Sequence, residues 1–263
     1  MELRLFQIDV FTKRLFGGNP AGVIPLDRWL DDVVMQRIAR ENNLSETAFF
    51  VSEGNHYGLK WFTPTVEVSL CGHGTLASAF VLFNELEPGR TEVCFETLSG
   101  LLNVAQDGDR ILMDFPAWVL EPVDKIPKAL VEGIGMTPME VFITRSKDNL
   151  FAILRDEAQV RSVQPRLECL ETLHPAGVVI TAQGEHSDCA SRYFAPSYGI
   201  PEDPGTGSIH CGLAPFWGER LRKKEIYACQ MSSRGAELYC EHRGDRVIIG
   251  GEAVKYLEGR IIL

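Results

Sequence analysis

Apolar and polar residues alternate along several short segments of the chain, which is the pattern of β-strands that bury one face. The clearest segments are 3-LRLFQIDVF-11, 47-TAFFV-51 and 57-YGLKWF-62, which are rich in aromatic and β-branched residues and are bounded by Gly, Asn and Pro. Few helical patterns lie between such segments. The sequence therefore predicts strands that pair mainly in the antiparallel sense.

Two longer segments predict helices. The first, 75-TLASAFVLFNEL-86, is apolar nearly all round, which is typical of a buried helix. The second is 206-TGSIHCGLAPFWGERL-221, and shorter helices with a polar face are predicted at 31-DDVVMQRIARE-41 and around 165-PRLECLETL-173. Each of the two long apolar helices is predicted to be buried by strands around it. Two such units predict an α+β fold with a cleft between two halves.

An internal repeat supports this organisation. The segment 61-WFTPTVEVSLCGHGT-75 aligns with 193-YFAPSYGIPEDPGTG-207 at a constant shift of 132 residues, and this alignment matches Cys71 with Asp203. Further matches occur in the same order: 19-NPAGVI-24 with 149-NLFAIL-154, and 100-GLLNVAQDGDRILM-113 with 235-GAELYCEHRGDRVII-249. Matches that keep their order indicate a duplication rather than chance.

The repeat divides the chain into two predicted halves. The N-terminal half, 1–118, carries the CGHGT helix start, and the C-terminal half, 119–263, carries the DPGTGS helix start. The last strand, at about 252–262, is able to pack back on the N-terminal half. The linker is predicted near 116-PAWVLEPVDKIP-127, where three prolines interrupt the periodicity.

Glycine and polar residues gather at the start of both apolar helices. Glycines let backbone N–H groups point at a ligand, and a helix start carries about half a positive charge. Such a start binds anions, so two of them facing each other would hold a carboxylate-bearing molecule without a metal. The simpler alternative is that Asp203, Thr206 and Ser208 are only turn and N-cap residues.

Other ligand sites are disfavoured by the sequence. No lysine follows the second glycine cluster as in a phosphate-binding loop, and His210 stands where the dinucleotide-binding pattern needs its third glycine. The pairs of cysteine and histidine close in sequence (Cys71 with His73, His186 with Cys189, His210 with Cys211) lack a spacing that converges on a tetrahedral metal site. We therefore predict neither a metal nor a cofactor.

Three residues are candidates for proton transfer. Glu46 follows a loop and precedes an apolar strand, where a carboxylate is costly unless it is used or paired, although a surface glutamate after a helix cap is the plain alternative. His73 lies between two glycines and is poorly placed to fill a core, which favours a role in handling ligand or protons. Asp203 occupies the corresponding start in the other half.

At these residues the chain resembles the phenazine biosynthesis-like isomerase family, relatives of diaminopimelate epimerase. The matching segments are 18-GNPAGV-23, 43-NLSETAF-49, 62-FTP-64, 71-CGHGT-75, 194-FAP-196 and 202-EDPGTGS-208. The resemblance implies a diaminopimelate epimerase-like α+β fold of two pseudo-symmetric halves. Each half is an antiparallel sheet or barrel wrapped around a central apolar helix, and the site lies between the halves.

The resemblance also implies proton transfer at carbon without a cofactor. Glu46 matches the general acid/base, His73 and Asp203 match assisting residues, and Ser208 matches a substrate contact. The full set of predicted substrate-binding residues is Asn19, Cys71, Gly72, Gly74, Gly205, Thr206, Gly207 and Ser208. A homodimer is implied as well.

The chain departs from its relatives in ways that bear on the reaction. The related epimerases use two cysteines, one per half, whereas here Cys71 keeps the first position and Asp203 replaces the second. Gly74 and Gly205 stand where many members have alanine, and 209-IHC-211 replaces a run of small residues. The substitution by Asp203 favours isomerisation, in which a proton moves between carbons of a small carboxylate-bearing metabolite. The alternatives are a racemase or epimerase that uses Cys71 with an opposing carboxylate, and a binding protein without catalysis.

Charge and composition limit the partners. The formal net charge is −10 and the basic residues are scattered, so no surface for nucleic acid is predicted. No apolar run approaches 18 residues and the N-terminus does not resemble a signal peptide, so we expect a cytoplasmic protein with no membrane partner. The seven cysteines are dispersed without a CxxC pair, which fits reduced thiols.

Overall fold

The computed structural model describes residues 1–263, which form two compact units. Unit 1 consists of residues 1–115 together with 248–263, and unit 2 consists of residues 116–247. The C-terminal segment belongs to unit 1 because strand β18 (Ala253–Ile262) pairs along its length with strand β1 (Glu2–Val10). Unit 2 therefore ends at residue 247, whereas the predicted second half ran to residue 263.

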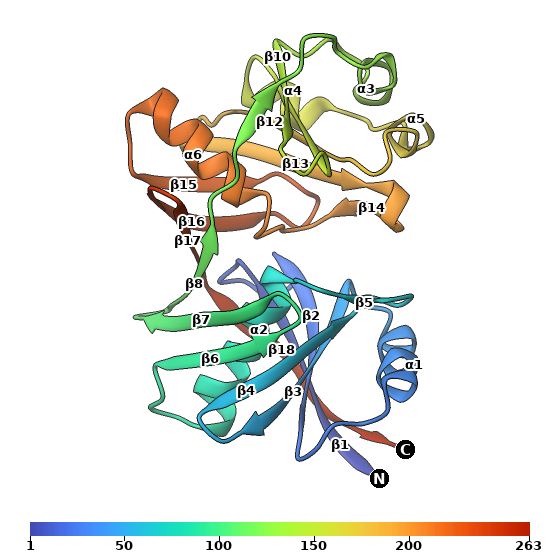
Figure 1. Cartoon of the computed structure of the whole chain (residues 1–263), viewed down its shortest axis with the longest axis vertical. Coiled ribbons are helices and arrows are strands. Elements are labelled where there is room, and N and C mark those ends of the chain that lie inside the picture. The colour runs from blue at the N-terminus through green and yellow to red at the C-terminus, as the bar shows by residue number, and fades with distance from the viewer. The chain divides into compact units, whose positions relative to one another are not determined.

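Unit 1 contains nine strands, two α-helices and a π-helical turn, labelled in Figure 1 where there is room. Between β1 and β18 the chain forms β2 (Asn19–Leu26), α1 (Asp32–Asn42), β3 (Glu46–Glu53), β4 (His56–Phe62), β5 (Glu67–Val68), α2 (Gly72–Val81), the π-helical turn (Leu82–Leu86), β6 (Glu92–Thr97), β7 (Gly100–Asp107) and β8 (Arg110–Pro116).

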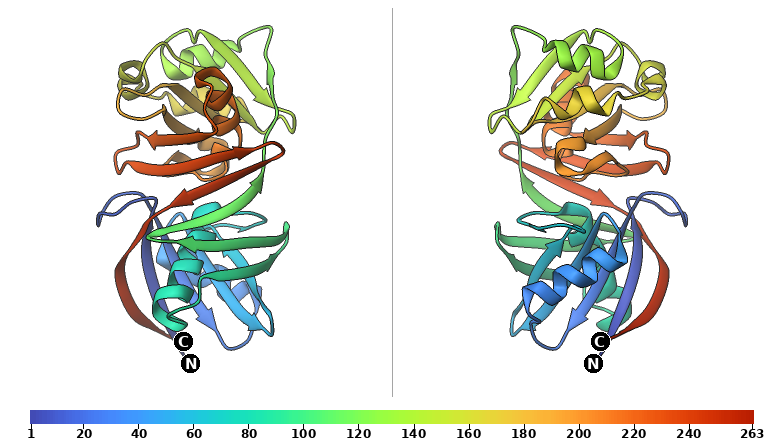
Figure 2. Two further views of the ribbon diagram at one scale, coloured as in Figure 1. Left: turned by 90° about the vertical axis from the view of Figure 1, so that its left-hand side faces the viewer. Right: turned by 90° about the vertical axis from the view of Figure 1, so that its right-hand side faces the viewer.

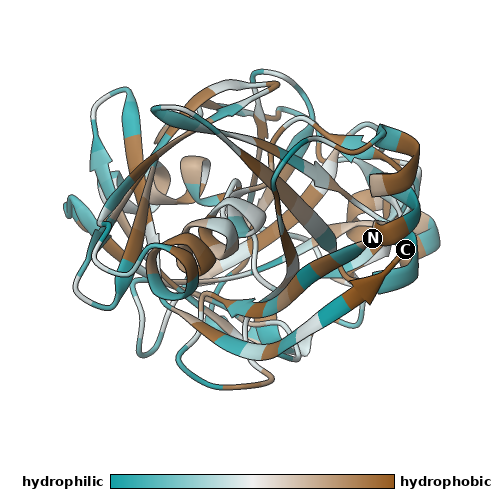
Figure 3. Ribbon diagram, turned by 90° about the horizontal axis from the view of Figure 1, so that it is seen from below, coloured by the Kyte–Doolittle hydropathy of each residue, from teal (hydrophilic) through white to brown (hydrophobic).

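Helix α2 packs against the neighbouring strands at one end of the unit 1 sheet. Strand β1 lies between β18 and β2, and the two side views of Figure 2 show β1 in blue beside β18 in red. Helix α2 contacts β1, β2 and β3, and nine of its ten residues are buried. Hydrophilic and hydrophobic residues alternate along the strands that carry the N and C labels in Figure 3, as predicted for 3–11. The core of unit 1 thus forms where the inner faces of these strands meet an apolar helix.

Unit 2 has the same kinds of elements. In chain order they are β9 (Leu120–Pro122), α3 (Lys128–Ile134), β10 (Glu140–Thr144), β11 (Asn149–Ile153), α4 (Glu157–Ser162), α5 (Leu167–Glu171), β12 (Gly177–Gln183), β13 (Cys189–Ala195), a 3₁₀ turn (Pro196–Tyr198), β14 (Ile200–Asp203), α6 (His210–Leu221), β15 (Glu225–Gln230), β16 (Ala236–Arg243) and the first residues of β17 (Arg246–Gly251), which continues into unit 1. No helix in the structure is long and apolar enough to span a membrane.

Strand pairing repeats between the units. In unit 1, β2 is parallel to β3, β3 is antiparallel to β4, and β4 is parallel to β6. In unit 2, β11 is parallel to β12, β12 is antiparallel to β13, and β13 is parallel to β15. The sheets are therefore mixed rather than antiparallel throughout. Helical segments lie between the strands of each parallel pair, and such crossovers are what parallel pairing needs.

The strand register corrects one of the sequence matches. The sequence alignment matches Phe62 with Phe194, and since Phe62 pairs with Thr47 and Phe194 pairs with Val178, it also matches Thr47 with Val178. One residue earlier on the strand, Glu46 pairs with Ala21 and Gly177 pairs with Asn149. The residue of β2 that corresponds to Asn149 is therefore Ala21, two positions beyond the Asn19 of the sequence match.

The helix predictions differ from the structure mainly at one end. The segment predicted at 75–86 is helical from Gly72 through the π-helical turn to Leu86, and the segment predicted at 31–41 is α1. The predicted helix 206–221 begins only at His210. Its lead-in is a tighter turn, in which the N–H of His210 donates to the Gly207 carbonyl (3.0 Å) and the N–H of Cys211 donates to the Ser208 carbonyl (3.0 Å).

Candidate active site

A buried acid–base pair lies at the start of α2. Atom Oε2 of Glu46 is 2.9 Å from Nε2 of His73. Glu46 is 9% exposed and His73 is 5% exposed, so little water screens the pair. Asn19 lies on the other side of the ring, with its Nδ2 atom 3.3 Å from Nδ1 of His73. Three of the predicted site residues therefore meet in one place.

Strand pairing and the helix start explain this meeting. Glu46 is the first residue of β3 and pairs with Ala21 on the parallel strand β2, which begins at Asn19. Two side chains from neighbouring strand ends thus reach the same edge, and α2 places His73 in its first turn against them.

Cys71 caps the helix and joins the same cluster. Its Sγ atom accepts a hydrogen bond from the N–H of Gly74 (3.2 Å), and its carbonyl accepts one from the hydroxyl of Thr75 (2.6 Å). The sulfur lies 3.6 Å from Nδ1 of His73. Cys71 is therefore an N-cap that also contacts the imidazole.

Gly74 is required by close packing. A Cβ atom at this position would lie 2.6 Å from Cδ1 of Trp61 and 3.0 Å from Sγ of Cys71. The indole ring cannot move aside as a flexible side chain would, so alanine does not fit beside it. Trp61 therefore lies beside Cys71 and Gly74 at the start of α2, whereas in the sequence it was noted only as part of the internal repeat.

The charges of the cluster are set by burial and by each other. Burial opposes protonation of His73, but the negative charges that Cys71 and Glu46 can carry outweigh burial and raise the pKa of His73 well above its usual value. Burial first and the Glu46 charge second raise the pKa of the Cys71 thiol. The thiol of Cys71 and the imidazole of His73 are therefore both shifted toward their protonated forms.

The second glycine cluster forms a separate polar network in unit 2. Asp203 ends β14 and is buried, and its carboxylate accepts a hydrogen bond from the hydroxyl of Thr206. Thr206 lies three residues after Asp203 and is hydrogen-bonded to it, just as Gly74 lies three residues after Cys71 and is hydrogen-bonded to it. Gly205, Gly207 and Ser208 lie in the same connection between β14 and α6.

Gln230 holds this connection in place. Its Oε1 atom accepts a hydrogen bond from the N–H of Thr206 (2.7 Å), and its Nε2 atom donates to the carbonyl of Asp203 (2.7 Å). Ser232 adds a hydrogen bond to the carbonyl of Pro204 (2.8 Å). Neither residue was predicted from the sequence, where the only signal was an amide at the end of the apolar strand 225-EIYACQ-230.

Unit 2 has no counterpart of Glu46. The equivalent position on β12 is Gly177, where a Cβ atom would lie only 2.3 Å from the hydroxyl oxygen of Tyr193. That hydroxyl donates to Oδ1 of Asn149 (2.9 Å), and burial raises the pKa of Tyr193. The duplication is therefore chemically asymmetric, because a neutral phenol occupies the place of the carboxylate.

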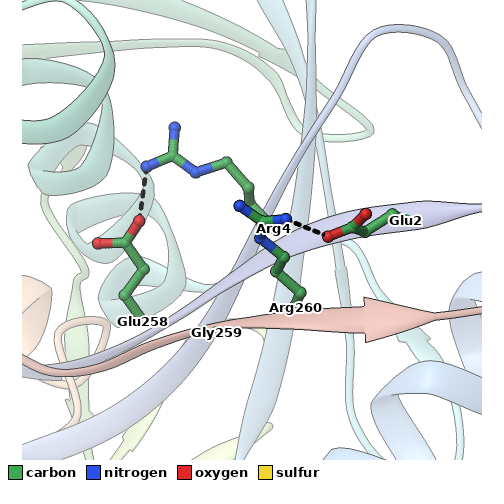
Figure 4. Close-up of a pocket in the computed structure, with 5 residues that line it drawn as sticks. All are labelled: Glu2, Arg4, Glu258, Gly259 and Arg260. Atoms are coloured by element: carbon green, nitrogen blue, oxygen red, sulfur yellow. Dashed lines mark hydrogen bonds and ion pairs between the residues drawn. The ribbon is translucent and has the colours of Figure 1, made fainter.

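A surface hollow across β1 and β18 offers a contrasting set of charges (Figure 4). Its two arginines are paired: Arg4 donates to Glu258 (2.8 Å) and Arg260 donates to Glu2 (2.6 Å). These side chains are exposed, so the pairs are screened by water. The hollow has none of the burial that distinguishes the Glu46–His73 pair.

Solved structures define the class of fold. A phenazine biosynthesis protein from Enterococcus faecalis has a TM-score of 0.96 and 42% sequence identity, and the alignment covers 100% of both chains. A hydroxyproline epimerase from Agrobacterium vitis has a TM-score of 0.61 at 11% identity, covers 99% of this chain and 92% of its own, and shares the fold alone. The chain therefore has the fold of epimerase-like isomerases.

Sequence comparison identifies the family within this class. The family model described as phenazine biosynthesis-like protein matches residues 8–259. Two proteins of Pseudomonas aeruginosa named as uncharacterized isomerases are each 46% identical over 263 residues, with 100% of both chains covered. The chain belongs to the phenazine biosynthesis-like protein family, and it is an isomerase of that family.

Proposed function

We propose that the chain is a cofactor-independent isomerase that moves a proton between carbons of a small carboxylate-bearing metabolite. The observation that carries this proposal is the buried contact between Glu46 and His73 at the start of α2. A carboxylate that lies beside an imidazole and is shielded from water can accept a proton from carbon and return that proton at another carbon.

The remaining residues of the cluster have supporting roles in this proposal. The imidazolium of His73 balances the charge of Glu46 and is available for a second proton transfer. Backbone N–H groups at the start of α2 stabilise the negative charge that develops as the carbon acid ionises. On the strength of the family resemblance, Asp203 remains a proposed catalytic residue that assists proton transfer, and Ser208 remains a proposed substrate contact. A positioned acid/base contributes about 10²–10⁴-fold to the rate, and donors placed for the developing charge add a comparable factor.

A racemase or epimerase that uses Cys71 is the second candidate. It is favoured by the 3.6 Å contact between the sulfur of Cys71 and His73, because a nearby imidazole can take up a thiol proton. The raised pKa of Cys71 argues against it, since the reactive form of a cysteine is the thiolate. Gly177 stands in unit 2 at the position that matches Glu46, so unit 2 offers no second carboxylate base at that position for a two-base epimerase.

Proton exchange at carbon tests the proposal across a range of candidate substrates. A panel of small unsaturated, hydroxy and amino carboxylates is incubated with the full chain in D₂O, and loss of C–H signals is followed by NMR. We expect exchange with at least one compound for the wild type, none for Glu46→Gln, and wild-type exchange for Glu41→Gln, which makes the same chemical change at an exposed site. Full exchange by Glu46→Gln would remove Glu46 from the mechanism.

A further inference from the structure

We propose that the Glu46–Cys71–His73 cluster also binds a single zinc ion, and that zinc bound there inhibits the enzyme. The three side chains offer a carboxylate oxygen, a sulfur and an imidazole nitrogen, which are the donors that zinc takes in proteins. Their donor atoms all lie within 4.8 Å of one another. Zinc binding itself does not depend on the proposed reaction, whereas its inhibitory effect rests on it.

The donor distances suit one ion. In a tetrahedral site with Zn–S near 2.3 Å and Zn–N near 2.0–2.1 Å, neighbouring donors are roughly 3.3–3.6 Å apart. Sγ of Cys71 lies 3.9 Å from Nε2 of His73, and that nitrogen lies 2.9 Å from Oε2 of Glu46. One separation is slightly long and the other slightly short, and the third, between Sγ of Cys71 and the carboxylate oxygen of Glu46, is at most 4.8 Å.

Neighbouring groups already support two of these ligands. Asn19 contacts Nδ1 of His73 through its amide group, which leaves Nε2 to face the ion, and a flip of that amide would let its oxygen accept a hydrogen bond from the Nδ1–H of the metal-bound ring. The N–H of Gly74 donates to Sγ of Cys71, and the helix start favours a negatively charged sulfur there.

Sequence spacing could not reveal this site. Cys71 and His73 are two residues apart and supply only two donors, whereas the third comes from β3 through its pairing with β2. Each of the three residues keeps a small exposed fraction, with Glu46 at 9%, Cys71 at 6% and His73 at 5%. Oε2 of Glu46 is itself buried, so an ion enters only as side chains around the cluster move, and water or a substrate atom then completes its coordination.

Binding replaces protons and involves no oxidation or reduction. Zinc forms bonds to the Cys71 sulfur and the His73 nitrogen as the thiol and the imidazolium each release one proton. Glu46 binds through its existing carboxylate. Once that carboxylate is a ligand it no longer takes a proton from carbon, which is why the occupied site is inhibitory.

A second cluster provides the matched control. His56 lies 2.8 Å from Oε2 of Glu96 and 3.4 Å from Oε2 of Glu53, but this group is partly or fully exposed and contains no sulfur. Glu53 is also engaged as the acceptor of a hydrogen bond from the indole of Trp29 (2.9 Å). We expect this surface group to bind zinc much more weakly than the buried one.

Cobalt(II) reports the site directly, because a thiolate bound to it gives a charge-transfer band in the near ultraviolet. The metal-free full-length protein is titrated with Co²⁺ and then Zn²⁺, with calorimetry to count ions and released protons. We expect one ion per chain, up to two protons released, and a thiolate band that zinc removes. Cys71→Ser is expected to lose the band and to weaken zinc binding by about 100-fold or more, and His56→Ala to retain both.

The outcomes separate this proposal from the proposed reaction, since no substrate is needed. Absence of a thiolate band in the folded wild type would overturn the zinc site, whatever the behaviour of the variants. Equal zinc affinity in Cys71→Ser, or loss of binding in His56→Ala, would overturn it as well. With a substrate from the D₂O panel, zinc is then expected to suppress exchange in the wild type at concentrations that saturate the cobalt-reported site.

Discussion

Nε2 of His73 lies 2.9 Å from Oε2 of Glu46, with both residues buried at the start of an apolar helix. An imidazolium without a partner in such a poorly solvated place costs several kcal/mol or is neutralised by a pKa shift. The ionisation state of His73 therefore depends on its neighbours, and the first prediction measures the part that Glu46 contributes.

His73 is expected to remain protonated well above pH 6.5, and Glu46→Gln to lower the pKa of His73. A histidine whose folded pKa is raised adds stability that is fully present below its unfolded pKa of about 6.5, and this stability is lost as the pH rises through the folded pKa. The imidazole proton shifts of His73 report the pKa, and urea unfolding between pH 6 and 10 with a chelator present reports the stability. Parallel stability curves for wild type and Glu46→Gln would contradict this coupling.

His210 is expected to behave in the opposite way. Burial lowers the pKa of His210 to about 4, with a smaller opposing effect from its hydrogen bond to the Thr206 carbonyl (2.8 Å). The unfolded chain therefore takes up this proton first, so stability falls as the pH drops from about 6.5 to about 4, by roughly 3 kcal/mol at most. In urea unfolding measured at several acid pH values, His210→Gln should lose this part of the fall in stability. A His210 ring signal that titrates near pH 6.5 in the folded protein would exclude this account.

Gly74→Ala is expected to destabilise unit 1 by about 1–3 kcal/mol, because the new Cβ meets Trp61 and Cys71. The clash with Trp61 predicts a specific coupling. In a Trp61→Phe background, which lacks the five-membered ring, the added cost of Gly74→Ala should fall by about 0.5 kcal/mol or more. Denaturant midpoints for the four proteins of this cycle measure it, and strictly additive effects would show that the indole does not impose the glycine.

Gln230→Ala is expected to destabilise the protein by about 2–4 kcal/mol, because it leaves the Thr206 N–H and the Asp203 carbonyl without their buried partner. The matched change Gln183→Ala, at an exposed strand end, should have an effect within about 0.5 kcal/mol of zero. Amide hydrogen exchange at Thr206 should accelerate selectively in Gln230→Ala. Unchanged protection at Thr206 would show that Gln230 does not hold the connection.

The sequence predicted the strands and buried helices where local patterns were strong. The alternation in residues 3–11 and the apolar run of 75–86 each became the expected element, because burial of one face or of a whole helix leaves a periodic signal. The parallel pairs were missed, since whether two strands run parallel depends on crossovers that join distant segments. The start of α6 was placed about one turn too early, because the residues after the glycine cluster form tighter turns before the regular helix begins at His210.

For the site, residue type and motif pointed to Asn19, Glu46, Cys71 and His73, and the structure brings these four together. Trp61 and Gln230 could not be chosen in the same way. Each lies at the end of an ordinary strand pattern, and its role depends on which backbone group or glycine it faces across the fold. Such contacts are set by tertiary packing and leave no periodic signal in the sequence.

Deuterium exchange at substrate carbon, compared between Glu46→Gln and Cys71→Ala, tests the central claim most directly. If Glu46 is the base, Glu46→Gln loses exchange by about 10²-fold or more while Cys71→Ala retains measurable exchange. If Cys71→Ala instead abolishes exchange and Glu46→Gln preserves it, a thiol carries the proton and the assignment of Glu46 is wrong.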